Sequence, residues 1–129
     1  MAVATRDVHS RLVRRARRAG EDPSLGFLTK AEAYLELLSK WNRRINLTAL
    51  PLDPPSDEAI DRLIIEPLVA ARQVSRADRL AIDVGSGGGS PGIPFHLAKP
   101  DVAVVLVEVK VRKSAFLREV VRHLELGDV

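Results

Sequence analysis

The stretch that most constrains the fold is residues 80–92, LAIDVGSGGGSPG. Its first five residues are mainly apolar and predict a short β-strand. The strand runs into a loop that contains Gly85, Gly87, Gly89 and Gly92. Glycine lets the backbone turn sharply and leaves no side chain in the way of a ligand. Pro94 then suits the first turn of a helix, whose free N–H groups attract an anionic group. Strand, glycine loop and helix together predict a nucleotide-cofactor site.

Two classes of cofactor fit this loop. Gly87, Gly89 and Gly92 match the GxGxxG fingerprint of dinucleotide-binding proteins, which is a weak signal when it stands alone. Residues 83–89, DVGSGGG, also match the acid-x-Gly-x-Gly-x-Gly loop of methyltransferases that use S-adenosylmethionine (SAM). Asp83 favours SAM, because the methionyl end of SAM carries an ammonium group as well as a carboxylate. A tight turn that binds nothing is the third interpretation.

The composition is typical of one small soluble domain. The chain has 129 residues, of which 46% are hydrophobic and 29% are charged. It has no cysteine, which excludes disulfides and thiolate metal sites and agrees with a cytoplasmic location. Its three histidines are far apart, so no metal site is predicted. No apolar run approaches the roughly 20 residues that cross a bilayer, so no membrane contact is predicted either.

The positive charge is concentrated at the N-terminus. Residues 1–20 contain six arginines and one acidic residue, a balance of +5, whereas the other 109 residues have a balance of −2. Residues 6–19 have the periodicity of an amphipathic helix with arginines around its outer faces. Three interpretations stay open: contact with RNA phosphates, an organellar transit peptide, or a solvated helix face.

The sequence divides into three parts: a basic extension and linker over residues 1–28, a helical region over residues 29–79, and a sheet-forming part over residues 80–129. Thr29 and Glu32 have the spacing of a capping box, which would start a helix there. Tyr34, Leu38 and Trp41 then form an apolar stripe that predicts a core-facing helix side, with Trp41 as a packing anchor.

A second amphipathic helix is predicted over residues 57–65. Pro67 should end or kink it, since proline cannot donate to the preceding turn, and residues 68–74 should continue as a short helical piece. Arg62 and Glu66 lie four residues apart and are spaced to form an ion pair across one turn.

The sheet-forming part contains a second strand. Residues 102–107, VAVVLV, are a continuous apolar run, which predicts a strand that is covered on both faces in a parallel sheet. Glu108 follows the strand, and a carboxylate there can accept hydrogen bonds from both ribose hydroxyls of an adenosine cofactor. A last helix is predicted over residues 112–126, with Gly127 as its cap.

Three segments together carry a family resemblance: residues 34–48 (YLELLSKWNRRINLT), 81–94 (AIDVGSGGGSPGIP) and 112–126 (RKSAFLREVVRHLEL). They resemble the small-subunit ribosomal RNA methyltransferase G family, also called glucose-inhibited division protein B. The resemblance implies a bacterial, cytoplasmic enzyme that uses SAM to methylate N7 of a guanine in 16S rRNA, with the small ribosomal subunit as partner. It implies an α/β fold in which N-terminal helices precede a Rossmann-like SAM-binding sheet.

The resemblance also assigns site residues. The family's cofactor loop falls on residues 85–90, where members use the positions of Gly85 and Ser90 against SAM, and Glu108 stands at the position of the strand-end acid. Ser90 replaces a bulky apolar residue. Leu63 stands in place of a histidine and Pro67 in place of a serine. The resemblance assigns no catalytic residue, because guanine N7 has a free lone pair and loses no proton on methylation.

The family's sheet has seven strands, and this chain stops after the second strand and its helix. We therefore expect an incomplete sheet of two parallel strands with bare edges. The resemblance predicts a truncated or split form, and a separate chain that supplies the other strands is one interpretation. A non-catalytic fragment that binds SAM or RNA is the main alternative function, followed by a NAD-binding oxidoreductase domain.

Overall fold

The computed structural model describes residues 2–129, with side chains from Asp7 onward. Two long helices come first, α1 (Ala2–Arg18) and α2 (Leu25–Asn42). A helical run follows, made of α3 (Asp57–Ile60), the π-helical turn η1 (Asp61–Ile65), α4 (Glu66–Ala70) and the 3₁₀ turn η2 (Ala71–Gln73). The sheet-forming part is β1 (Leu80–Val84), α5 (Gly92–Ala98), β2 (Ala103–Val107) and α6 (Val111–His123). None of the helices within residues 2–129 combines the length and apolarity that a membrane crossing requires.

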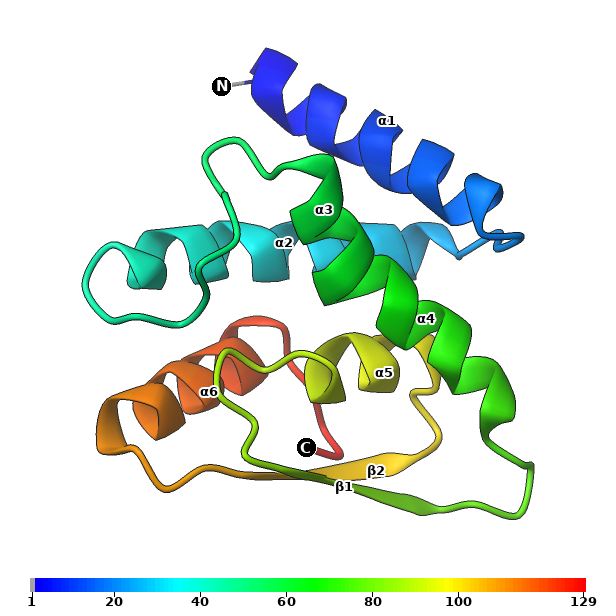
Figure 1. Cartoon of the computed structure of the whole chain (residues 1–129). Coiled ribbons are helices and arrows are strands. Elements are labelled where there is room, and N and C mark those ends of the chain that lie inside the picture. The colour runs from blue at the N-terminus through cyan, green and yellow to red at the C-terminus, as the bar shows by residue number, and fades with distance from the viewer. Residues whose placement is uncertain (1) are drawn as a thin grey trace.

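The two strands form a parallel pair, in register from Leu80 opposite Ala103 to Val84 opposite Val107. Helix α5 makes the crossover between them (Figure 1). The predicted α/β class is confirmed, and the two-stranded parallel sheet is that of a partial Rossmann-like fold.

The described helices lie on one side of the sheet. Figure 1 shows α5 and α6 next to the strands, with α2 beyond them and α1 farthest away. On this side Val104 is 3% exposed, whereas its neighbour Val105, on the other side, is 45% exposed. Large apolar side chains are also exposed on that other side at Leu80, Ile82, Val84 and Val107. The prediction that residues 102–107 are covered on both faces is wrong, because no described element packs against the second face.

A single core joins the helical region to the sheet. The α2 side chains of Tyr34 and Leu38 are fully buried, as is Phe116 of α6. Trp41 is half-buried with its ring centroid 5.6 Å from that of Phe116, which confirms it as a packing anchor. Leu12 of α1 is also fully buried, so the N-terminal helix is part of the same core.

Helix α2 begins earlier than the capping box predicted. Its first residue is Leu25, and the Ser24 hydroxyl caps it by accepting a hydrogen bond from Phe27 N at 3.1 Å. The helix extends back by one turn because Phe27 is itself a core residue. Glu32, freed from a cap, accepts a hydrogen bond from the His9 ring at 2.5 Å and so joins α2 to α1.

The regular α-helix is interrupted just before Pro67 by the π-helical turn, and the run then continues through α4 and η2, as predicted for residues 68–74. Two other local predictions differ from the structure. Arg62 pairs with Glu58 at 3.4 Å, one turn before it, and not with Glu66. Glu125, with φ of 54°, takes the left-handed conformation after α6 that was expected of Gly127.

Candidate cofactor-binding site

The glycine loop leaves the end of β1 directly beside the end of β2. The backbone N–H groups of Gly85 and Ser86 both donate to the Val107 carbonyl, at 2.8 and 3.0 Å. Gly85, Gly87 and Gly89 have φ of 76°, 53° and 95°. These are left-handed conformations that glycine adopts without strain, so the loop's turn depends on glycine at these positions.

The glycines meet different surroundings. A Cβ on Gly89 would lie 2.8 Å from Ile93 Cδ1, and one on Gly92 would lie 2.6 Å from Asp83 Oδ2. These two glycines let the loop and the start of α5 pack closely. A Cβ on Gly85 would meet nothing within 4 Å. The loop is therefore open at Gly85, which is where a ligand can approach the backbone.

Glu108 lies against the loop, as its place at the end of the neighbouring strand predicts. Its Oε1 accepts a hydrogen bond from Gly87 N at 2.7 Å, and its Oε2 accepts one from Lys110 N at 2.8 Å. The bond from Lys110 N, followed by that from Gly87 N, lowers the pKa of the Glu108 carboxyl below its ordinary value. Glu108 is thus an ionised acceptor, and a carboxylate has about four acceptor positions, of which the backbone occupies two.

Asp83 and Ser90 both take part in fixing the loop. Asp83 Oδ2 accepts a hydrogen bond from Gly92 N at 3.1 Å and so anchors the start of α5 to β1. The Ser90 hydroxyl donates to the Leu63 carbonyl at 2.9 Å. Ser90 therefore ties the loop to η1, and its hydroxyl is directed at the helical region. Leu63 and Ser90, two of the positions at which the resemblance predicts other residues, are thus joined through the Leu63 backbone.

Tyr34 is a loop contact that sequence reasoning missed. Its hydroxyl donates to the Gly88 carbonyl at 2.6 Å, and the side chain is fully buried. Burial, and then the charge of Asp83, raises the pKa of Tyr34, so the hydroxyl stays a protonated donor. A Cβ on Gly88 would lie 3.2 Å from Leu38 Cδ1, so α2 forms the back of the loop. One signal in the sequence could have indicated this contact. Tyr34 is on the predicted core-facing side of its helix, and a buried tyrosine requires a hydrogen-bond partner for its hydroxyl.

Ser86 is a second residue that the prediction did not single out. It is 2% exposed, and its hydroxyl donates to the Asp83 carbonyl at 2.8 Å. Its own carbonyl accepts from Gly89 N at 2.8 Å. The loop is thus closed on itself by hydrogen bonds on both sides of Gly87.

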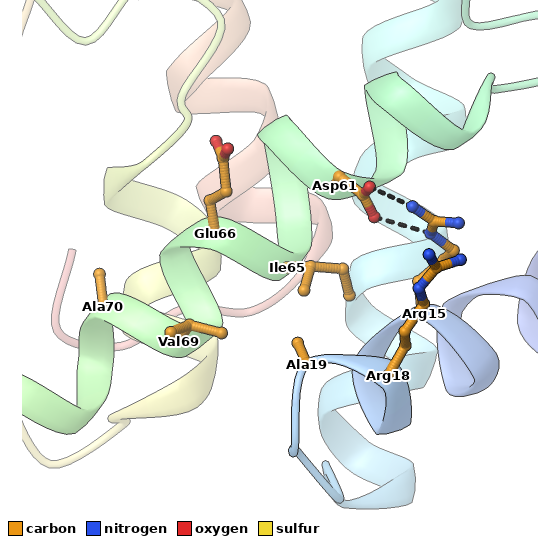
Figure 2. Close-up of a pocket in the computed structure, with 8 residues that line it drawn as sticks. All are labelled: Arg15, Arg18, Ala19, Asp61, Ile65, Glu66, Val69 and Ala70. Carbon is orange, nitrogen blue, oxygen red and sulfur yellow. Dashed lines mark hydrogen bonds and ion pairs between the residues drawn. The ribbon is translucent and has the colours of Figure 1, made fainter.

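Two pockets lie elsewhere. One, of about 450 Å³, lies between α1 and the η1–α4 run; its lining includes Arg18, Ile65 and Glu66, and Arg15 is joined to Asp61 at its edge (Figure 2). The other, of about 360 Å³, lies between the start of α2, the end of α5 and residues 125–128. Neither includes a loop glycine or Glu108. The loop and Glu108 instead meet at the carboxyl ends of the strands, where open parallel sheets bind their ligands.

Comparison with known proteins points in one direction. The sequence model of the family described as rRNA small subunit methyltransferase G matches residues 28–129. Proteins named "Ribosomal RNA small subunit methyltransferase G" are 39% identical in Xanthomonas euvesicatoria, 48% in Xylella fastidiosa and 39% in Neisseria meningitidis, each over 97 residues. These alignments cover 74–75% of this chain and 42–45% of the relatives. The chain therefore spans less than half the length of these relatives.

The family match includes β1, the glycine loop, β2, Glu108 and most of α2, whose Tyr34 supports the loop. Helix α1 lies outside it. The chain belongs to the rRNA small subunit methyltransferase G family.

Proposed function

We propose that this chain carries the SAM-binding half of an enzyme that methylates N7 of a guanine in 16S rRNA. The observation that supports the proposal most is the contact between Gly87 N and Glu108 Oε1, at 2.7 Å. It places a loop with an open glycine and an ionised carboxylate side by side at the end of two parallel strands. The name of the family supports the methyltransferase class and rRNA as the substrate class.

The residues present fit SAM. Gly85 leaves the backbone open to a ligand. Glu108 has acceptor positions left for ribose hydroxyls, and Asp83 lies under the loop with a charge suited to the methionyl ammonium. Gly87 and Gly89 keep the loop in the conformation that allows this approach. Ser90 contributes by holding the loop to η1.

SAM, when bound, supplies an electrophilic methyl group on a sulfonium. Guanine N7 is already a nucleophile, so no residue of the chain has to remove a proton. The protein has to hold the methyl group of SAM in line with guanine N7. Such alignment of two reactants can by itself account for a large part of an enzyme's rate enhancement. The rigid, hydrogen-bonded loop suits that work.

The alignments cover less than half of the relatives' length. The other strands that the family resemblance implies would come from further residues of the same polypeptide or from a separate chain. It places the protein in the cytoplasm with the small ribosomal subunit as its partner. The exposed sheet face at Ile82, Val84 and Val105 favours a second candidate function. In it, the chain binds SAM but does not by itself catalyse the transfer of the methyl group.

Titration calorimetry with SAM and with NAD tests the proposal. We expect the chain to bind SAM and to prefer it to NAD, and Glu108→Gln to weaken SAM binding about tenfold or more, because a charged acceptor forms the stronger hydrogen bonds. Glu119→Gln is the matched control, since it changes another surface carboxylate, one that pairs with Arg122 on α6. Preference for NAD, or equal effects of the two variants, contradicts the proposal.

A further inference from the structure

The arginines of α1 fall into two sets. Arg11 donates to Asp57 at 2.7 Å, and Arg15 Nε donates to Asp61 at 2.9 Å. Both acids belong to the α3–η1 run, so these arginines dock α1 onto the helical region. Leu12 completes the docked side and is fully buried.

The second set is Arg14, Arg17 and Arg18, which we name the outer arginine face. All three are exposed, and none takes part in an ion pair among the side chains described from Asp7 onward. Spacings of three and four residues place them on the side of the helix opposite Leu12, with Arg18 at the rim of the pocket between α1 and α4. Arg11 and Arg15 therefore hold α1 to the helical region, whereas the outer arginine face makes no such contact among the described side chains.

Within the described part of the chain, the outer arginine face lacks the acidic partners that other helical arginines have. Arg11 has Asp7, Arg62 has Glu58 and Arg122 has Glu119 three or four residues away on the same helical run. Like charges at such spacing repel and weaken a helix. The helix dipole favours cations in the last turn, which includes Arg17 and Arg18 but not Arg14. Ion pairs within the described side chains therefore do not account for these three arginines.

The distribution of charge favours a polyanion as the partner of α1. Residues 1–20 have a balance of +5, whereas the other 109 residues have −2, so the excess positive charge of the chain lies at α1. We propose that the outer arginine face binds the phosphate backbone of RNA. Guanidinium groups form paired hydrogen bonds with phosphate oxygens, and the released counterions supply much of the free energy. RNA as the partner rests on the proposed function; the assignment of the surface rests on the arginine geometry.

The test measures RNA binding by fluorescence anisotropy over a series of NaCl concentrations, with a labelled RNA stem–loop as the probe. We expect the combined variant Arg14→Gln, Arg17→Gln, Arg18→Gln to bind at least tenfold more weakly than the wild type. The slope of log K against log [NaCl] should become shallower by about 2, as the loss of three phosphate contacts predicts. The melting midpoint should stay unchanged, because the three side chains are exposed.

The matched control is Arg76→Gln, Arg79→Gln, Lys99→Gln, which removes the same charge near the amino ends of the strands. An equal loss in both variants would mean that only net charge matters and would overturn the proposal. So would wild-type affinity in the α1 variant, or a wild-type chain that does not bind the probe.

A SAM titration of the α1 variant separates this inference from the proposed function. We expect SAM affinity equal to that of the wild type, because the outer arginine face is not part of the loop. If the wild type binds the RNA probe through α1 but does not bind SAM, the proposed function fails and the surface assignment stands. If SAM binds and the α1 variant still binds RNA normally, the surface assignment fails alone.

Discussion

Tyr34 and Gly88 are 54 residues apart in the sequence and are joined by one hydrogen bond. Because the hydroxyl is fully buried, its removal leaves the Gly88 carbonyl without that donor and without access to water. We infer that Tyr34 helps the loop keep its shape, a role that neither the glycine motif nor the apolar stripe of α2 indicates.

The variant Tyr34→Phe keeps the ring and deletes the donor. We expect it to lower the free energy of unfolding in urea by about 1–3 kcal/mol, the usual cost of leaving a buried polar group without its partner. Amide exchange at Gly89, whose N–H closes the loop onto Ser86, should become faster. Ser56→Ala is the control, since it deletes the hydrogen bond that caps α3. Exchange at Gly89 that changes no more than in this control would contradict the role.

Glu108 predicts a pH dependence. The N–H groups of Lys110 and Gly87 lower its pKa in the folded protein below the ordinary value of 4.5. A lowered folded pKa means that the stabilisation is fully present above the unfolded pKa and is lost as the pH falls through the folded one. The stability difference between the wild type and Glu108→Gln should therefore shrink as the pH falls below 4.5, measured by urea unfolding at each pH. A difference that is independent of pH would refute this assignment.

At the scale of elements, the loop and the helical run are coupled through two unusual residues. Pro67 has no N–H to donate to the carbonyl four residues before it, which is that of Leu63. The Ser90 hydroxyl donates to this same carbonyl at 2.9 Å. The serine thus supplies a donor to a carbonyl that Pro67 cannot reach with an N–H, and we expect the two residues to be coupled through it.

A double-mutant cycle tests this compensation. We expect Ser90→Ala to lower the free energy of unfolding by about 1 kcal/mol or more in the wild type, and by less when Pro67→Ala has restored a backbone N–H. The measurement is urea unfolding of the four proteins. Equal effects of Ser90→Ala in both backgrounds would show that the two positions act independently.

Whether an element could be predicted depended on how local its signal was. The strand β1, the glycine loop and Glu108 follow from short runs of residues, and the structure brings them together as expected. The start of α2 was misplaced, because the capping box competes with Ser24, and the burial of Phe27 decides in favour of Ser24. The hydrogen bonds of Tyr34 and Ser90 cross 54 and 27 residues and leave no periodic trace in the sequence.

On the scale of the whole molecule, a one-sided α/β unit places its candidate cofactor site at the carboxyl ends of the two strands. The helices cover one face, α2 supports the loop from behind, and the loop meets Glu108 at the carboxyl ends of the strands (Figure 1). The other face carries exposed apolar side chains, including Ile82 at 61% and Val84 at 78%. The prediction that residues 102–107 are covered on both faces needed further helices on the second face, and the described residues form none there.

The central claim is that the glycine loop and Glu108 form the SAM site, and an NMR titration of the isotopically labelled chain with SAM tests it most directly. We predict that the largest amide shifts fall on Gly85, Gly87 and Lys110, whose N–H groups lie at the loop opening or on the Glu108 carboxylate. Glu108→Gln should reduce these shifts at the same SAM concentration. Shifts centred on the pocket between α1 and α4, or no shifts at a saturating concentration, would contradict the claim.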